Sequence, residues 1–533
     1  MMKPFNSNIV IGSQSSHFWF RLDNKSFKMK KLLYFILVVT AVTSCSTQSS
    51  NGHLIGASGR PAWYQADPYG MLYVKSGAFN MGQSDEDVPS ASNNKTKTVS
   101  VAAFYMDQTE ITNNEYRQFV NWVRDSTALR LLAANIGPED YLIETYDDML
   151  SAKDEDEWNL NWDAKFRYSA INPANPDKIA EETAPVLAEM FLNQSQRFYN
   201  RKEIDTRKLK FEYYWIDLQQ AAYKGRVKIK SLSNSAAGVD TEHREKMVDA
   251  QGNPAELPFP ADPGEVPGRD YNLGFRNSKG QNNAIRGHSD RSRFIIKEII
   301  NVYPDTLCWI HDFTYANNEY MTNMYFWHPA YDEYPVVGVT WQQCNAFNVW
   351  RTQLLNSWRK SNYEAFVQDF RLPSETEWEY AARGGLDNNP YPWGGPYARN
   401  SRGCFLGNFK PIRGRYMEDG GFHTVKANSY HPNDFGLYCM AGNVAEWCRT
   451  SYDESMYEYG HDMNTEYIYN ALDHDPPSMK RKVIRGGSWK DIGFYLQTGT
   501  RTYEYQDTAK SYIGFRSVMN YLGRGGPNKE GDF

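Results

Sequence analysis

Cysteine and histidine are the side chains in this chain best able to hold a transition metal or to act as nucleophiles. The sequence has 6 cysteines and 10 histidines among its 533 residues. The cysteines form no CxxC pair, and the histidines show no HxxxH or HExxH spacing. Zinc and iron sites usually take ligands at such short spacings. We therefore expect no zinc or iron site, and burial as small apolar side chains for most of the cysteines.

Cys45 stands apart because it follows a short apolar segment. Met29-Lys-Lys31 precedes an apolar run at 32–42, which Thr43-Ser44 separate from Cys45. About 11 apolar residues, at 1.5 Å of rise each, are too few for a bilayer core of roughly 30 Å, so the run predicts a signal peptide. The segment resembles a lipobox, after which Cys45 would become the acylated first residue of the mature protein. An ordinary secretory signal is the alternative.

The remaining cysteines lie in a compartment that permits disulfides if this export is correct. Their number is odd, so at least one thiol stays free. They are Cys308, Cys344, Cys404, Cys439 and Cys448.

Composition excludes some functions and favours a folded chain. The net charge is −6, and no basic run is longer than the three residues Lys480-Arg481-Lys482, so nucleic acid is not an expected partner. A content of 41% apolar and 15% aromatic residues is enough for one large core or two ordinary ones. The many aromatic residues and glycines predict an irregular α+β fold with modest regular structure.

Three helices are predicted from capping boxes, in which the side chains at the first and fourth positions bond to each other's backbone N–H. The boxes are Thr112-Asn-Asn-Glu115, Thr340-Trp-Gln-Gln343 and Ser374-Glu-Thr-Glu377. The apolar residues that follow them are Tyr116, Phe119, Val120 and Val123, then Phe347, Trp350 and Leu354, then Trp378, Ala381 and Ala382. We expect all three helices to pack into the core, the third to end at Gly384, and short strands at 73–74 and 336–339.

A series of sequence blocks carries a family resemblance through its order. The blocks are Gly77-Ala-Phe-Asn-Met-Gly82, Phe104-Tyr-Met-Asp-Gln-Thr-Glu-Ile-Thr-Asn113, Tyr334-Pro-Val-Val-Gly-Val-Thr-Trp341, Arg371-Leu-Pro-Ser-Glu-Thr-Glu-Trp-Glu-Tyr380, Tyr391-Pro-Trp-Gly394, Gly442-Asn-Val-Ala-Glu-Trp447, Arg485-Gly-Gly-Ser-Trp489 and Gly514-Phe-Arg516. Together they resemble the formylglycine-generating enzyme, or sulfatase-modifying-factor, domain. The resemblance implies a C-type-lectin-like fold with little regular structure.

The resemblance also implies a division of the chain. We expect a signal peptide with an N-terminal extension at 1–45, a tether at 46–68, the first part of the domain at 69–123, an insertion at 124–331, the second part of the domain at 332–521 and a tail at 522–533. The insertion replaces what the family builds as a short connection.

Catalytic members of the family bind copper(I) with two cysteines. Counting from Arg485-Gly-Gly-Ser-Trp489, Asp491 and Leu496 occupy the corresponding positions. A carboxylate is a hard ligand and leucine has no donor atom, so neither suits copper(I). The iron-dependent branch of the family is also not indicated, because the sequence has no HxxxHxE. We therefore expect no catalysis and no copper.

Structural calcium is a separate implication of the resemblance. Asn443 and Glu446, with the carbonyl of Val444 or Ala445, match one set of oxygen ligands, which are the kind that calcium prefers. A second set resembles Asn408 and Phe409 with Asp419 and Gly421. As alternatives, Asn443 can serve a turn, and Glu446 can be a surface charge or pair with an arginine.

A narrower resemblance links two segments, 302–315 and 324–331, to the PorK/GldK lipoproteins of the type IX secretion system. It implies a lipid anchor in the outer membrane, facing the periplasm, and a ring assembled with a PorN/GldN-like partner and further copies of the chain. The gliding-motility lipoprotein GldJ is the close alternative.

Two other classes of function remain open. One is a periplasmic enzyme using Asp491, His423 or Glu504, and the other is a carbohydrate-binding module. For a ring component, we expect the insertion to supply partner contacts, with Tyr213, Tyr214 and Trp215 as either interface anchors or core residues.

Overall fold

The computed structural model describes residues 63–65, 67–83, 95–144, 159–169, 177–216, 269–272, 295–312, 319–411, 417, 420–471 and 475–525. The chain divides into two compact units, one formed by Met1–Trp63 with Gly525–Phe533 and the other by Tyr64–Arg524. Cys45 and Asp419 lie outside the described residues. Among the described residues, no helix is both long and apolar enough to cross a membrane.

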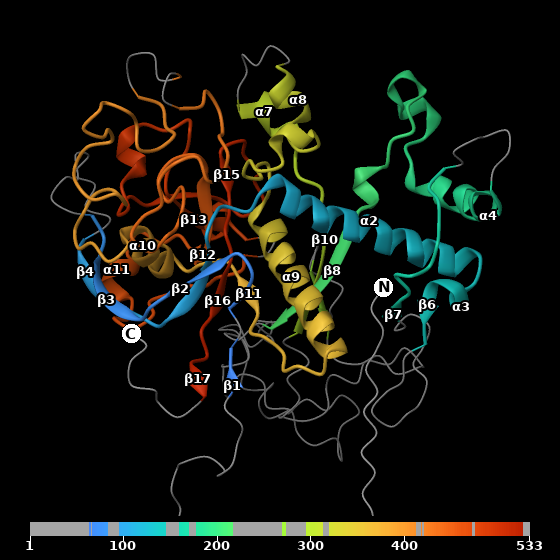
Figure 1. Cartoon of the computed structure of the whole chain (residues 1–533), viewed down its shortest axis with the longest axis horizontal. Coiled ribbons are helices and arrows are strands. Elements are labelled where there is room, and N and C mark those ends of the chain that lie inside the picture. The colour runs from blue at the N-terminus through green and yellow to red at the C-terminus, as the bar shows by residue number, and fades with distance from the viewer. Residues whose placement is uncertain are drawn as a thin grey trace, which may run out of the picture. The chain divides into compact units, whose positions relative to one another are not determined.

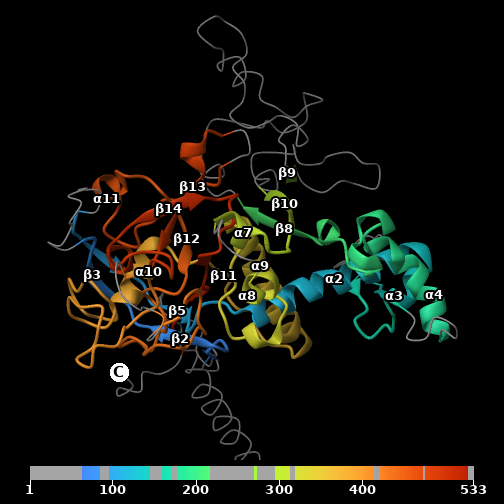
Figure 2. The same cartoon turned by 90° about the horizontal axis from the view of Figure 1, so that it is seen from above.

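The larger unit begins its first long helix where the capping box predicts it. In α2 (Asn113–Asn135), Thr112 Oγ1 accepts from the N–H of Glu115, and Glu115 Oε2 accepts from the N–H of Thr112 at 2.8 Å. Tyr116 and Phe119 are fully buried, as expected from their spacing. The helix continues past Val123 towards α3 (Pro138–Tyr141) and α4 (Lys178–Leu187), so the segment after 123 extends an element of the domain (Figure 2).

The other two predicted helices also form. α9 (Trp341–Ser361) and α10 (Glu375–Arg383) have capping boxes at Thr340 and Ser374, and α10 ends at Gly384 with a left-handed φ of 61°. One prediction for α9 is wrong, because the side chain of Leu354 is 46% exposed. Leu355 takes the inward position at this turn of the helix and packs on the aromatic cluster around Tyr105.

Most strands pair antiparallel in small sheets. One four-stranded sheet has the order β11 (Phe370–Arg371), β16 (Val518–Asn520), β5 (Phe104–Asp107), β2 (Met71–Val74). A second has the order β14 (Thr502–Tyr505), β13 (Arg481–Arg485), β12 (Ala445–Ser451), β15 (Ile513–Gly514), and its β12–β15 pair is parallel. β3 (Gly77–Met81) pairs with β4 (Lys97–Val101), β1 covers Trp63–Tyr64 and β17 covers Arg524–Gly525. The mixture of helices and short sheets confirms the predicted α+β class (Figure 1).

The segment at 336–339 is buried but is not a strand, so that prediction is wrong. Its backbone groups bond singly to three different segments: Val336 N–H donates to Ile111 O, Gly338 N–H donates to Lys510 O, and Gly338 O accepts from Asp305 N–H. Gly338 has a φ of 75°, which breaks the extended geometry that a ladder needs. The apolar run therefore reflects burial and not sheet pairing.

The largest core cluster forms where α2 packs on α9 and on the second sheet. Tyr116 stacks on Phe347 with ring centroids 5.6 Å apart, and Phe515 meets Phe347 edge-on at 5.4 Å. Trp447 from β12 is fully buried in the same cluster. Aromatic side chains thus hold together segments that share little regular structure.

The expected insertion contributes its own sheet, with the order β8 (Lys210–Ile216), β10 (Ile295–Asn301), β9 (Arg269–Asn272). The insertion also contains β6 (Leu142–Ile143) paired with β7 (Asn159–Leu160), and the short helices α7 (Cys308–Asp312) and α8 (Tyr320–Met324). Side chains alternate along β8: Tyr213 is buried, Trp215 is partly buried against the core, and Tyr214 is 47% exposed. Of the three proposed anchors, Tyr213 is therefore a core residue and Tyr214 faces outward.

Candidate functional site

The two positions that match the catalytic cysteine pair lie in different surroundings. Asp491 Oδ2 accepts from Ser488 Oγ at 2.6 Å, and burial raises the pKa of the Asp491 carboxyl. Leu496, at the end of the 3-10 helix Gly493–Leu496, is completely buried. Its cluster consists of Tyr391, Phe405, Phe409 and Ala441. This apolar packing leaves no sulfur or nitrogen donor at the second position.

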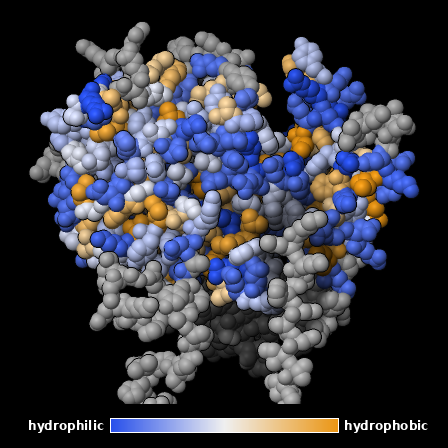
Figure 3. All heavy atoms as spheres, in the orientation of Figure 1, coloured by the Kyte–Doolittle hydropathy of each residue, from blue (hydrophilic) through white to orange (hydrophobic). Residues whose placement is uncertain are grey.

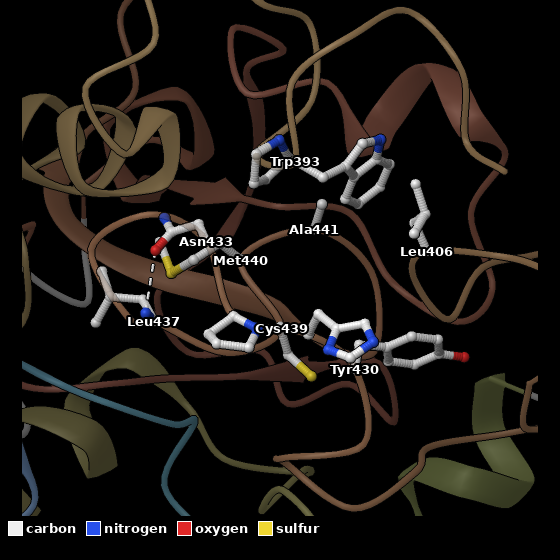
Figure 4. A pocket seen from close by; sticks show the side chains of 11 residues that line it. Trp393, Leu406, Tyr430, Asn433, Leu437, Cys439, Met440 and Ala441 are labelled. Atoms are coloured by element: carbon white, nitrogen blue, oxygen red, sulfur yellow. Dashed lines mark hydrogen bonds between the residues drawn. The ribbon is translucent and has the colours of Figure 1, made fainter. Parts of the chain in front are cut away.

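A shallow pocket opens beside this cluster (Figure 4), with an empty volume of about 300 Å³ that includes open solvent. Trp393 and Ala441 border both the pocket and the cluster. Leu437 N–H donates to Asn433 Oδ1 at 3.0 Å and so fixes the turn on the opposite wall. The one thiol in the lining belongs to Cys439.

Cys439 has an unusual backbone for a non-glycine residue, with a φ of 50°. Burial raises the pKa of its thiol well above 9.0, and the nearby Glu110 carboxylate adds to the shift. A thiol kept protonated is a poor nucleophile and a poor metal ligand. Cys308, Cys344 and Cys448 are buried too, while Cys404 is exposed, and no described cysteine is in a disulfide. These placements confirm that burial is the use of most of the cysteines.

Glu446 lies at the centre of a buried ion pair. Its Oε1 accepts from Arg516 Nη2 at 2.6 Å, and its Oε2 accepts from Arg516 Nε at 2.7 Å. The indole Nε1 of Trp378 also donates to Oε2 at 2.7 Å. Glu446 and Arg516 are each 1% exposed or less. The carboxylate is therefore neutralised by a bidentate guanidinium in a site without water access.

A second buried carboxyl, Glu110, adjoins this pair. Asn443 Nδ2 donates to Glu110 Oε2 at 2.7 Å, and Val444 N–H donates to Oε1 at 3.3 Å. Asn443 has a φ of 67°, and its Oδ1 accepts from Val425 N–H at 2.9 Å. Desolvation, and then the charge of Glu446, raise the pKa of Glu110 well above 4.5. One arginine thus serves two buried carboxyl groups, of which Glu110 is the one that favours the neutral form.

The first predicted set of calcium ligands does not fit a calcium ion in this arrangement. A cation at Glu446 would have to displace the Arg516 guanidinium and the Trp378 indole, and the Asn443 Oδ1 is occupied by a backbone donor. No group of three or more His, Cys, Asp or Glu side chains within the described ranges is arranged to hold a metal ion. The arginine-pairing alternative for Glu446 matches the geometry.

The second predicted set of calcium ligands lies only partly within the described residues. Asn408 Nδ2 donates to His423 O at 2.7 Å, Phe409 packs beside Leu496, and Gly421 lies two residues before His423. Asp419, the one carboxylate of the set, lies outside the described residues. Calcium at this set stays a prediction.

We expect Glu110→Gln to flatten the dependence of stability on pH. A folded-state pKa above the unfolded value means that the stability due to this group is fully present below about pH 4.5 and is lost as the pH rises through the folded pKa. Glutamine cannot ionise, so the variant should lose less stability than the native protein as the pH rises above about 4.5. Urea unfolding across this range measures the two slopes, and equal slopes would contradict a raised pKa.

The three residues considered for a new enzyme centre have separate partners. His423 Nε2 lies 3.2 Å from Glu319 Oε2, and its ring packs edge-on against Trp309 and Trp489. Asp491 pairs with Ser488, as above, and Glu504 is a strand residue of β14 opposite Lys482. The described structure therefore does not assemble them into one constellation.

Glu110 and Arg516 are the site residues that sequence reasoning missed. Both stand inside family blocks, Thr109-Glu-Ile-Thr-Asn113 and Gly514-Phe-Arg516, but nothing in either block shows that they meet. A charged residue inside an apolar block is a signal for a buried pair. It does not identify the partner.

Comparison with known proteins identifies the domain. The sulfatase-modifying factor enzyme 1-like domain matches residues 61–188 and 306–521, which leaves 189–305 outside the match. The chain is 35% identical over 191 residues to inactive C-alpha-formylglycine-generating enzyme 2 of Bos taurus, covering 34% of this chain and 50% of the relative. It is 33% identical over 196 residues to the formylglycine-generating enzyme of Thermomonospora curvata, covering 36% of this chain and 56% of the relative.

Among solved structures, that of PvdO from Pseudomonas aeruginosa aligns with a TM-score of 0.37 and 13% identity, covering 85% of this chain and 94% of that one. The chain spans about half the length of the relatives it matches. The domain match, in contrast, takes in more than half of the chain, on both sides of the unmatched segment. This chain belongs to the family of sulfatase-modifying factor enzyme 1-like domains.

Proposed function

We propose that this chain is a non-catalytic outer-membrane lipoprotein that acts as a structural ring component of the type IX secretion system. It would be PorK/GldK-like, face the periplasm and act with a PorN/GldN-like partner. The observation that carries the proposal is the packing of Leu496, which closes the second catalytic position with apolar side chains while the domain around it is kept. A fold kept without its metal ligands is kept for its surfaces.

The matched relatives include one that is named as inactive, which supports a non-catalytic role for this domain. The C-type-lectin-like description of the fold belongs to the same proposal, as does structural calcium at the second ligand set. Copper is not part of it, because Asp491 accepts from Ser488 and Leu496 offers no donor.

The segment outside the family match supplies a candidate partner surface. In the β8–β10–β9 sheet, Tyr214, Ile216 and Ile299 are each about half exposed. Lys297 pairs with Glu212 on the same sheet at 2.8 Å, which surrounds the apolar side chains with charge. An apolar centre with a polar rim is the usual composition of a protein interface.

Affinity purification from membranes tests the proposal. We expect a PorN/GldN-like protein to copurify, large rings to appear in negative-stain images, and Tyr214→Ser with Ile299→Ser to reduce both. Trp162→Ser, at an exposed aromatic residue outside this sheet, is the matched control. Copurification with gliding proteins and no ring would favour the GldJ-like alternative.

An enzymatic outcome would overturn the scaffold. Purified protein that oxidises a cysteine-containing peptide with copper and oxygen would show that catalysis is retained. Asp491→Cys with Leu496→Cys serves as the comparison, because it restores the two thiols that the family uses and should have no effect on secretion.

A further inference from the structure

One side of the larger unit carries an exposed aromatic and aliphatic face that no described element covers. We call it the tether face and define it by Tyr69, Tyr73, Leu354, Trp358, Phe366 and Leu522, whose exposed fractions run from 46% to 99%. Apolar side chains gather over the lower half of α9 in the space-filling view (Figure 3). A set of this kind on one side of a domain marks a contact surface.

Tyr73, Leu354 and Phe366 of this face lie on or next to one underlying cluster. Tyr73 meets Tyr521 at 4.8 Å between ring centroids, and Tyr521 meets Tyr105 at 5.7 Å. Leu355 and Val367 pack on the same cluster, so Leu354 and Phe366, which adjoin them in the sequence, lie next to it.

Tyr69 joins the α9 side of the face through its backbone. Its carbonyl accepts from Arg351 Nη2 at 3.4 Å, one helical turn before Leu354. The Arg351 guanidinium also lies over the Phe370 ring at 4.4 Å and pairs with Asp107. The charge of Arg351 is therefore paired within the domain.

The chain enters the larger unit beside this face. Gln65 Oε1 accepts from Leu522 N–H at 2.9 Å, and Gln65 Nε2 donates to Asn520 O at 3.3 Å, on either side of Tyr521. About 20 residues separate Gln65 from Cys45 along the sequence, and a chain of that length can reach at most about 70 Å. A lipid at Cys45 would thus keep a bilayer within reach of these side chains.

We propose that the tether face rests on the surface of the lipid bilayer, with its tyrosine and tryptophan rings among the lipid headgroups; this rests on the proposed lipid anchor. Rings with an apolar body and a polar edge favour that depth. The contact itself can be weak, because the anchor raises the local concentration of bilayer. The face would set the orientation of the domain on the membrane.

Hydroxyl-radical footprinting of the full-length protein tests this orientation. The lipidated protein is reconstituted in vesicles of phosphatidylethanolamine and phosphatidylglycerol, and Cys45→Ala protein in buffer is the free reference. We expect oxidation of Tyr69, Trp358 and Phe366 to fall by about three-fold or more on vesicles, as for rings moved into headgroups. Trp162 and Tyr397, which are 49% and 75% exposed on other parts of the unit, are the internal controls and should be unchanged.

Three outcomes separate the possibilities. Native protein that stays out of the vesicle fraction would count against the anchor itself. Vesicle-bound protein with undiminished oxidation of the tether face would overturn the orientation while leaving the anchor intact. Equal protection in vesicle-free Cys45→Ala protein at high concentration would show that a second copy of the chain covers the face, and would also overturn the proposal. Trp358→Ser with Phe366→Ser should keep the fold and lose the protection of Tyr69.

Discussion

Replacing Glu446 by alanine is expected to lower the free energy of unfolding by about 3 to 5 kcal/mol, the cost of leaving a buried arginine without its counter-ion. Arg516 would keep its bonds to the carbonyls of Asp107 and Tyr438 but lose both carboxylate oxygens. The indole N–H of Trp378 would also lose its acceptor. Urea unfolding at neutral pH measures the difference.

Glu110 offers an internal control for this result. It adjoins Arg516, so in the Glu446→Ala protein it should ionise more readily and offset part of the loss. Adding Glu110→Gln removes that option. The free energy of unfolding should therefore fall by more in the double variant than in the two single variants together. An additive result would show that the two carboxyls do not share Arg516.

A chelator distinguishes the ion pair from a calcium site at the same residue. If Glu446 binds only Arg516 and no metal, EDTA should not change the loss of unfolding free energy caused by Glu446→Ala, because the chelator removes no ion from the native state. A fall in melting temperature with EDTA in the native protein, absent in Glu446→Ala, would restore the calcium assignment at this position.

Replacing Cys45 by alanine is expected to move nearly all of the protein from the membrane fraction to the soluble fraction. Each buried methylene of an acyl chain contributes about 0.8 kcal/mol, so several chains together outweigh any contact that the folded domain makes with lipid. Fractionation followed by immunoblotting measures the distribution, and an unchanged unfolding curve shows that the domain is intact. Full membrane retention of Cys45→Ala would contradict the anchor, and Cys404→Ala is the matched control because that thiol is exposed.

Local patterns predicted local structure well. The starts of α2, α9 and α10 follow from side-chain to backbone bonds within four residues, and the stop at Gly384 follows from its left-handed φ. Such features depend on a few consecutive residues and so can be read from the sequence.

Features that depend on distant residues could not be predicted in the same way. An apolar run at 336–339 is compatible with a strand, and only the partners at Ile111, Lys510 and Asp305 show that it is a buried loop. The partner of Glu446 could not be predicted for the same reason, because Arg516 lies 70 residues away along the chain. Spacing within a motif says which atoms a residue offers and not which residue will use them.

The order of strands in one sheet also constrains when the domain can fold. β16, at Val518–Asn520, lies between β5, at Phe104–Asp107, and β11, so the long-range pairing in this sheet needs almost the last residues of the domain. In a chain that is still emerging from the ribosome, β2 and β5 could pair only as a two-stranded sheet, and such a sheet is marginally stable by itself. The high sequence separation predicts that this sheet forms slowly and is completed only after residue 520 has been made. Such a delay would suit the export proposed above, because a chain that is still unfolded can be threaded through a translocation channel.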